Sequence, residues 1–165
     1  MRLSRETEYA LHGLVFLVRQ GPDAVAQLAE VAAATAIPAT FLSKIFQRLA
    51  RHGILRSHRG TLRGYSLGRH ANAIILREIL EATEGPDLFS RCAFWRGTCG
   101  GDEDPCVLHE IVKKSKAALE DDVAASSLAD LTRQWAPATP QRGRAATRGK
   151  EGNRWESGRR RGRSS

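Results

Sequence analysis

The chain has 165 residues, of which 41% are hydrophobic and 27% charged, and it carries a formal net charge of +8. This length suits one ordinary domain with appended helices or a tail, and it argues against a large enzyme core. A membrane span needs about 18 consecutive apolar residues, which the sequence lacks, and its charged N-terminus is unlike a secretory signal, so we expect a cytoplasmic protein.

The charge is unevenly distributed along the chain. Residues 1–69 carry a net charge of +6, residues 70–135 carry −5, and residues 136–165 carry +7. A basic folded segment is typical of a nucleic-acid contact, although basic surfaces also bind acidic proteins and membranes. The sequence therefore indicates a basic head, an acidic middle and a basic tail.

Three helices are predicted in the basic head. Residues 4–19 have the apolar spacing of an amphipathic helix that ends at Gly21-Pro22. Residues 26–35 predict a second helix, and a third begins at Pro38 and ends at Gly53, with Ile45 on its buried face. Because a two-residue connection separates the last two, they form either a helix-turn-helix or an ordinary helical hairpin.

A small β-wing is predicted after these helices. Residues 54–60 and 65–67 read as two short strands around a turn, and a basic wing favours the DNA-binding interpretation. Arg56, Arg59 and Arg63 can meet phosphates or enter the minor groove. The expected fold is mainly α with a small β-wing: a winged helix-turn-helix plus a long dimerisation helix.

The acidic middle predicts a helix over residues 74–84, a cysteine loop, a long amphipathic helix over residues 105–123, and a helical turn near residues 127–131. The long helix has too little chain around it to be covered, so we expect it to pack against a second copy in a homodimer. We expect residues 1–70 to form the DNA-binding domain, residues 71–132 the linking helix, cysteine loop and dimerisation helix, and residues 133–165 a disordered basic tail.

These residues resemble the winged-helix regulators of the Rrf2 family over about residues 1–132. The resemblance is carried by Met1-Arg2-Leu3-Ser4 with Tyr9-Ala10, Phe41-Leu42-Ser43-Lys44-Ile45, Ser57-His58-Arg59-Gly60, Gly64-Tyr65-Ser66-Leu67, the three cysteines with His109, and Leu128-Ala129-Asp130-Leu131. It implies a dimer that binds a double-stranded DNA operator as a transcription regulator, which we expect to be a repressor, and not an enzyme. The sequence departs from the family where Thr61-Leu62-Arg63 replaces most of the glycine-rich turn of the wing.

The positions expected to contact DNA come from the shape of the helix-turn-helix and the basic wing. They are Thr40, Ser43, Lys44, Arg48, Arg56, Arg59 and Arg63. No nucleophile motif, phosphate loop or paired catalytic carboxylates accompany them, which argues against an enzyme.

The three cysteines, Cys92, Cys99 and Cys106, lie within fifteen residues of sequence. An odd, clustered set argues against a disulfide framework and favours metal ligands. Zinc sites favour closely spaced cysteine pairs, which this loop lacks, and a polar loop is a poor place to bury free thiols. We expect an iron-sulfur cluster, either 2Fe-2S or 4Fe-4S, with zinc and unliganded cysteines as the alternatives.

The resemblance offers three precedents for the fourth ligand. His109 follows Cys106 in the C-x2-H spacing of one group of relatives, Glu8 matches a first-helix carboxylate that another group supplies from the partner subunit, and Glu8 with His12 matches a third. Glu8 and His12 could equally be a solvated charge and a packing residue. Loss of a bond made across the dimer would change the spacing of the recognition helices, in response to nitric oxide, redox state or cluster supply. A zinc-stabilised or metal-free regulator is the alternative.

Overall fold

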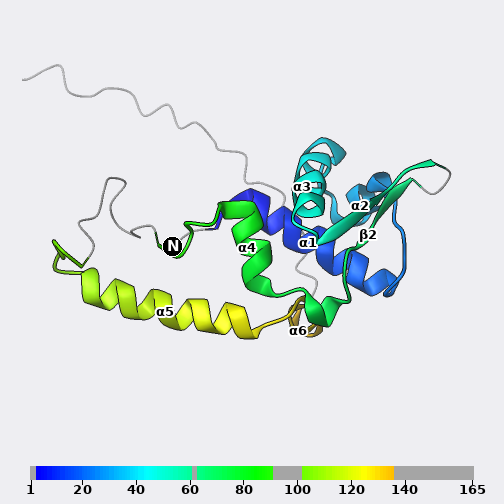
Figure 1. Cartoon of the computed structure of the whole chain (residues 1–165). Coiled ribbons are helices and arrows are strands. Elements are labelled where there is room, and N and C mark those ends of the chain that lie inside the picture. The colour runs from blue at the N-terminus through cyan, green and yellow to red at the C-terminus, as the bar shows by residue number, and fades with distance from the viewer. Residues whose placement is uncertain (1–2, 61–62, 91–101, 136–165) are drawn as a thin grey trace, which may run out of the picture.

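Helix α1 (Arg5–Gln20) is the central element of the computed structural model, which describes residues 3–60, 63–90 and 102–135 (Figure 1). It packs against α2 (Leu28–Thr35), α3 (Ala39–Arg51), α4 (Leu76–Glu84) and α6 (Leu128–Gln134). Ser4 caps α1 by accepting a hydrogen bond from the Thr7 amide, as capping side chains do.

The α2–α3 pair forms the predicted helix-turn-helix. The connection passes through Ala36, whose φ of 56° is left-handed, and Ile37, which is buried. Pro38 is the cap before α3, and Leu42, Ile45, Phe46 and Leu49 form the buried face of that helix. The close approach of α1 and α3 requires Gly13, because a Cβ there would lie 2.6 Å from the Phe46 ring.

The wing is a two-stranded antiparallel sheet of β1 (Leu55–His58) and β2 (Gly64–Leu67). Leu55 pairs with Leu67, and Arg56 pairs with Ser66. Ala26, two residues before the start of α2, forms an isolated bridge to Tyr65, so the wing is joined directly to the helix-turn-helix.

One hydrophobic core joins the first three helices, the wing, α4 and α6. Leu14, Val31, Phe46, Ile79 and Leu128 are all buried within it. The chain reaches α4 through the short helix η2 (Ala71–Ala73), and the backbone of Ile74 accepts from the Leu128 amide at 2.8 Å. The core therefore continues beyond the expected domain boundary at residue 70.

Helix α5 (His109–Ala125) packs on α4 and extends away from the body of the molecule (Figure 1). It begins four residues later than the sequence analysis predicted. Val123 is its buried residue, where it meets Leu80 and Phe89, whereas Ile111 is 67% exposed and Leu119 is 37% exposed. Its apolar side chains are thus largely uncovered within one chain.

The fold prediction is confirmed: the described residues form helices with a small β-wing. No single described helix is long and apolar enough to cross a membrane; α2 and α3 meet those criteria when taken together, but they are bent by 119°.

Candidate nucleic-acid interface and metal centre

The recognition helix α3 presents a polar face away from the core. Thr40 and Lys44 are exposed, while Ser43 is half-buried and accepts a hydrogen bond from Gln47 at 3.2 Å. The opposite face of the helix holds Leu42 and Ile45 in the core. Because burial of that face fixes the rotation of α3, three of the predicted contact residues share a surface that can enter a major groove.

A groove of about 890 Å³ lies between the start of α2, the C-terminal half of α3 and the wing. Its lining is Gln27, Leu28, Ala29, Gln47, Ala50, Arg51, Ser57, His58, Arg59, Arg63, Gly64 and Tyr65. Three of these residues are arginines, and the groove contains no acidic side chain. A groove with basic and no acidic side chains is complementary in charge to a phosphodiester backbone.

The wing holds its basic residues outward. Leu55 is buried, while Arg56, Arg59 and Arg63 are exposed. His58 Nε2 and Ser66 Oγ lie 2.8 Å apart across the two strands, which fixes the strand from which Arg59 continues. Of the unusual turn, Arg63 is described, whereas Thr61 and Leu62 lie outside the described residues.

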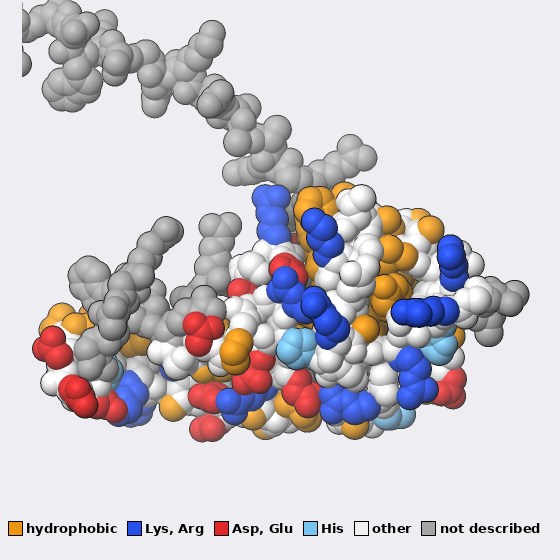
Figure 2. All heavy atoms as spheres, turned by 45° about the horizontal axis from the view of Figure 1, so that its top comes forward, with side chains coloured by type: hydrophobic (Ala, Val, Ile, Leu, Met, Phe, Trp, Pro, Cys, Tyr) orange, Lys and Arg blue, Asp and Glu red, His pale blue; other side chains and the backbone are white. Residues whose placement is uncertain are grey.

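Figure 2 shows how charge is distributed over one face of the molecule. Lys and Arg side chains lie mostly over the part that carries the wing and helical body, and Asp and Glu side chains are more frequent toward α5. This separation matches the predicted basic head and acidic middle, and it would orient an approaching polyanion toward the wing.

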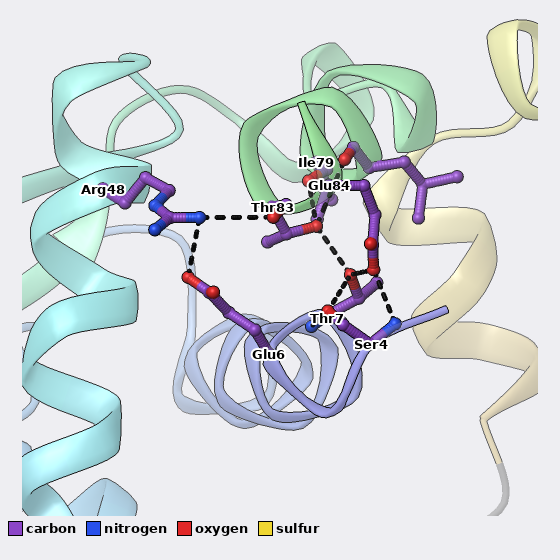
Figure 3. Close-up of polar contacts among 8 residues, drawn as sticks. Ser4, Glu6, Thr7, Arg48, Ile79, Thr83 and Glu84 are labelled. Atoms are coloured by element: carbon purple, nitrogen blue, oxygen red, sulfur yellow. Dashed lines mark hydrogen bonds and ion pairs between the residues drawn. The ribbon is translucent and has the colours of Figure 1, made fainter. Parts of the chain in front are cut away.

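Arg48 differs from the other predicted DNA contacts because its guanidinium is engaged within the protein (Figure 3). Its Nη1 lies 3.0 Å from Glu6 Oε1 on α1 and donates to the carbonyl oxygen of Thr83 at 3.2 Å. The sequence pattern placed Arg48 on the surface of α3 but did not reveal these two partners.

Arg51 is a groove residue that the sequence analysis missed. It is exposed two turns after Lys44 and one turn after Gln47, at the i, i+3, i+7 spacing of one helix face. This periodicity could have identified it. Among the described residues, Arg51 makes no hydrogen bond or ion pair in this structure, so its charge remains available at the groove.

Of the predicted thiolate ligands, Cys106 is described, and Cys92 and Cys99 lie outside the described residues. Cys106 is a half-buried free thiol, and its backbone carbonyl accepts from the His109 amide at 2.9 Å where α5 begins. The C-x2-H pair therefore lies on one turn of the chain. Thiolate and imidazole are suitable donors for either zinc or an iron-sulfur cluster.

His109 lies beside two carboxylates. Its Nε2 is 3.0 Å from Asp102 Oδ1, and Asp102, His109 and Glu110 each offer a ligand atom within 4.8 Å of one another. Lys113 also binds Asp102 at 2.6 Å, and these two contacts hold the pKa of the Asp102 carboxyl below its ordinary range. A carboxylate beside a histidine is the usual means of orienting a metal-binding imidazole.

The two candidate ligands of α1 have different surroundings. Glu8 is exposed, whereas His12 is half-buried and packs edge-on against Trp135, with ring centroids 5.1 Å apart. The Trp135 carbonyl in turn accepts from Arg19 at 2.8 Å. Within one chain His12 therefore has a packing role, and Glu8 faces the solvent.

The Rrf2 family, described as iron-dependent transcriptional regulators, matches residues 3–134. The transcriptional regulator IscR of Xenorhabdus nematophila is 27% identical over 133 residues, which cover 81% of this chain and 80% of that protein. IscR of Yersinia enterocolitica is 28% identical over 131 residues, covering 79% of each chain.

Solved structures agree on the fold. CymR, the global cysteine regulator of B. subtilis, superposes with a TM-score of 0.69 at 23% identity and covers 82% of this chain and 99% of its own. IscR of T. potens superposes with a TM-score of 0.64 at 21% identity, covering 84% and 94% respectively. The matched family consists of transcriptional regulators and not enzymes. The chain therefore belongs to the Rrf2 family of winged helix-turn-helix transcriptional regulators.

Proposed function

We propose that the protein is a cytoplasmic homodimer that represses transcription by binding a two-fold DNA operator, with an affinity set by an iron-sulfur cluster. The observation that carries the DNA-binding part is the acid-free groove between α3 and the wing, with Arg51, Arg59 and Arg63 in its lining. Thr40, Ser43 and Lys44 would read the major groove, and Arg56 would add a phosphate contact from β1.

The dimer part rests on α5. Ile111 and Leu119 are exposed on a helix that extends from the body, and such apolar side chains lose unfavourable contact with water when a second copy covers them. A dimer with two recognition helices would bind half-sites about one DNA turn apart, ~34 Å.

The cluster part rests on the donor set. Cys92, Cys99 and Cys106 would supply three thiolates, and the fourth bond would come from Glu8 or His12 of the partner subunit or from His109 of the same chain. The description of the matched family as iron-dependent supports iron over zinc. When bound, the cluster supplies a group whose charge and ligation change with nitric oxide, oxidation or iron loss.

DNA binding can be tested without knowing the operator. The protein is used to select bound duplexes from a randomised DNA library, and the affinity of the enriched duplex is then measured against salt concentration. We expect a two-fold sequence and a steep salt dependence, because each neutralised phosphate releases counterions. Failure to enrich any sequence would reject operator binding.

The metal proposal is tested on protein prepared anaerobically with iron and sulfide. We expect a brown protein containing iron and inorganic sulfide, and loss of the visible absorption in each single Cys→Ala variant of the three cysteines. A colourless protein that contains zinc instead would reject the cluster and leave a zinc-stabilised DNA-binding regulator.

A further inference from the structure

We propose that Arg48 is a positioning residue that transmits movement of the end of α4 to the recognition helix, an inference that rests on the proposed cluster-controlled DNA binding. The Arg48 side chain extends from α3 to α1 and α4, where it joins the group of polar contacts between these helices that Figure 3 shows. It contacts Glu6 of α1 at 3.0 Å and the backbone carbonyl of Thr83 in α4 at 3.2 Å.

The chemistry of a helix end explains the second contact. The last carbonyl groups of a helix have no amide partner within the helix, and they carry a partial negative charge. A guanidinium offers several N–H donors in a fixed plane, so it can bind a carboxylate and a carbonyl together. Arg48 therefore ties the position of α3 to the C-terminal end of α4.

The same end of α4 is also fixed to the start of α1. The hydroxyls of Thr83 and Thr7 lie 2.8 Å apart, and both residues are buried. The Glu84 carboxylate accepts from the Ser4 amide at 2.7 Å and also from the Thr7 hydroxyl. The Thr7–Thr83 contact is shielded from water, whereas the Ser4–Glu84 contact is exposed. Because several contacts join the start of α1 to the end of α4, these two ends should move together.

This cluster lies between the two predicted sources of the metal ligands. Cys92 follows Glu84 by eight residues, and Glu8 follows Thr7 directly. A change in either ligand would displace α4 or α1, and Arg48 would carry the displacement to α3. By contrast, Arg51 lies at the groove and has no such contacts among the described residues.

Arg48, as a positioning residue, and Arg51, as a DNA contact, should respond differently in the same binding experiment. The affinity of the enriched duplex is measured for cluster-loaded and cluster-free protein, in wild type, Arg48→Met and Arg51→Met. Loss of Arg48 should reduce the affinity ratio between the two states by about five-fold or more, with iron content and salt dependence unchanged. Loss of Arg51 should weaken both states equally and lower the salt slope by about one. An Arg48→Met protein that behaves like Arg51→Met or like wild type would overturn the inference.

A second measurement needs neither cluster nor operator. Thr7→Val removes the hydroxyl contact to α4 but leaves both contacts of Arg48, and hydrogen exchange reports how far the disturbance spreads. We expect faster exchange at the end of α4 and in α3, with the α3 effect lost when Arg48→Met is added. Unchanged exchange in α3, or a change that is equal with and without Arg48→Met, would reject the role of Arg48 in transmitting movement from α4 to α3.

If no cluster loads or no duplex is enriched, the proposed function fails, and this measurement still decides the role of Arg48. Arg48→Lys, which keeps a positive charge near Glu6, replaces Arg48→Met if that variant does not fold.

Discussion

Ala26 and Tyr65 exchange two backbone hydrogen bonds of 2.9 Å, so the wing is attached to the chain that enters α2. The neighbouring Gly64 permits this approach, because a Cβ at that position would lie 2.5 Å from the carbonyl oxygen of Ala26. The wing is therefore joined through the backbone to the first helix of the helix-turn-helix.

Gly64→Ala should loosen this connection. The added methyl group meets backbone and not a flexible side chain, so we expect a loss of about 1–3 kcal/mol in the free energy of unfolding. Hydrogen exchange at the Ala26 and Tyr65 amides should accelerate. Ser57→Ala, at an exposed position of the same sheet, is the matched control. An unchanged exchange rate at both amides would show that this approach is not tight.

Arg59→Ala should cost roughly 1–3 kcal/mol of operator binding and lower the salt slope by about one, because the residue lines the groove beside the wing. Lys44→Ala should weaken binding through the recognition helix in the same assay. Lys114→Ala, which removes an exposed charge from α5, should leave the affinity unchanged. Normal affinity in Arg59→Ala would place the wing off the DNA.

The helix-turn-helix and the wing could be predicted from the sequence because buried residues recur at the period of the helix or strand that holds them. Leu42, Ile45 and Leu49 repeat on one face of α3, and this spacing alone locates the core side of the helix. The boundaries were less accurate: residues 105–108 read as helix, but α5 begins at His109. The extra residues include Pro105 and Cys106, so the end of the cysteine loop occupies them and α5 begins after it.

The polar contacts between distant segments were not predictable in this way. Arg48 meets Glu6 and Thr83, and His12 meets Trp135, through tertiary packing that no local spacing encodes. From the sequence, an arginine on the surface of a recognition helix is predicted to contact DNA. The contacts of Arg48 with α1 and α4 are evident only in the three-dimensional structure. The cysteine site remains a sequence prediction, since two of its three thiols lie outside the described residues.

Leu119→Asp should convert the proposed dimer to monomers, because it places a charge in the apolar stripe of α5 that a second copy would bury. Sedimentation over a range of concentrations measures the change. Lys114→Asp alters charge at an exposed polar position of the same helix and should remain dimeric. A dimer in both variants would place the interface elsewhere.

Asp130 should make stability depend on pH near the start of α6. Hydrogen bonds from the Ser127 hydroxyl at 2.5 Å and the Ser127 amide at 3.0 Å hold the pKa of this carboxyl below its ordinary range. The folded pKa lies below the unfolded value of about 3.9, so the stabilisation is complete above that pH and is lost as pH falls through the folded pKa. We therefore expect Asp130→Asn to lower the melting temperature at pH ~7, with the difference from wild type shrinking toward pH ~3. Asp121→Asn, at an exposed site on α5, should show no such trend.

The last prediction concerns the fourth ligand of the proposed cluster. If Glu8 of the partner subunit supplies it, Glu8→Ala should alter the visible spectrum and the operator affinity without changing the fold, because Glu8 is exposed. His109→Ala should alter the spectrum instead if the C-x2-H pair holds the metal, since Cys106 and His109 lie on one turn.

His12 needs a control of its own, because His12→Ala also removes the edge-on contact with the Trp135 ring. Trp135→Leu removes that contact and keeps the imidazole. A spectral change in His12→Ala that Trp135→Leu does not reproduce would identify His12 as a ligand, whereas equal loss of thermal stability with an unaltered spectrum in both would identify a packing role. If all three ligand variants retain the wild-type spectrum and iron content, the fourth bond comes from a group outside Glu8, His12 and His109, and control through any of these three residues is rejected.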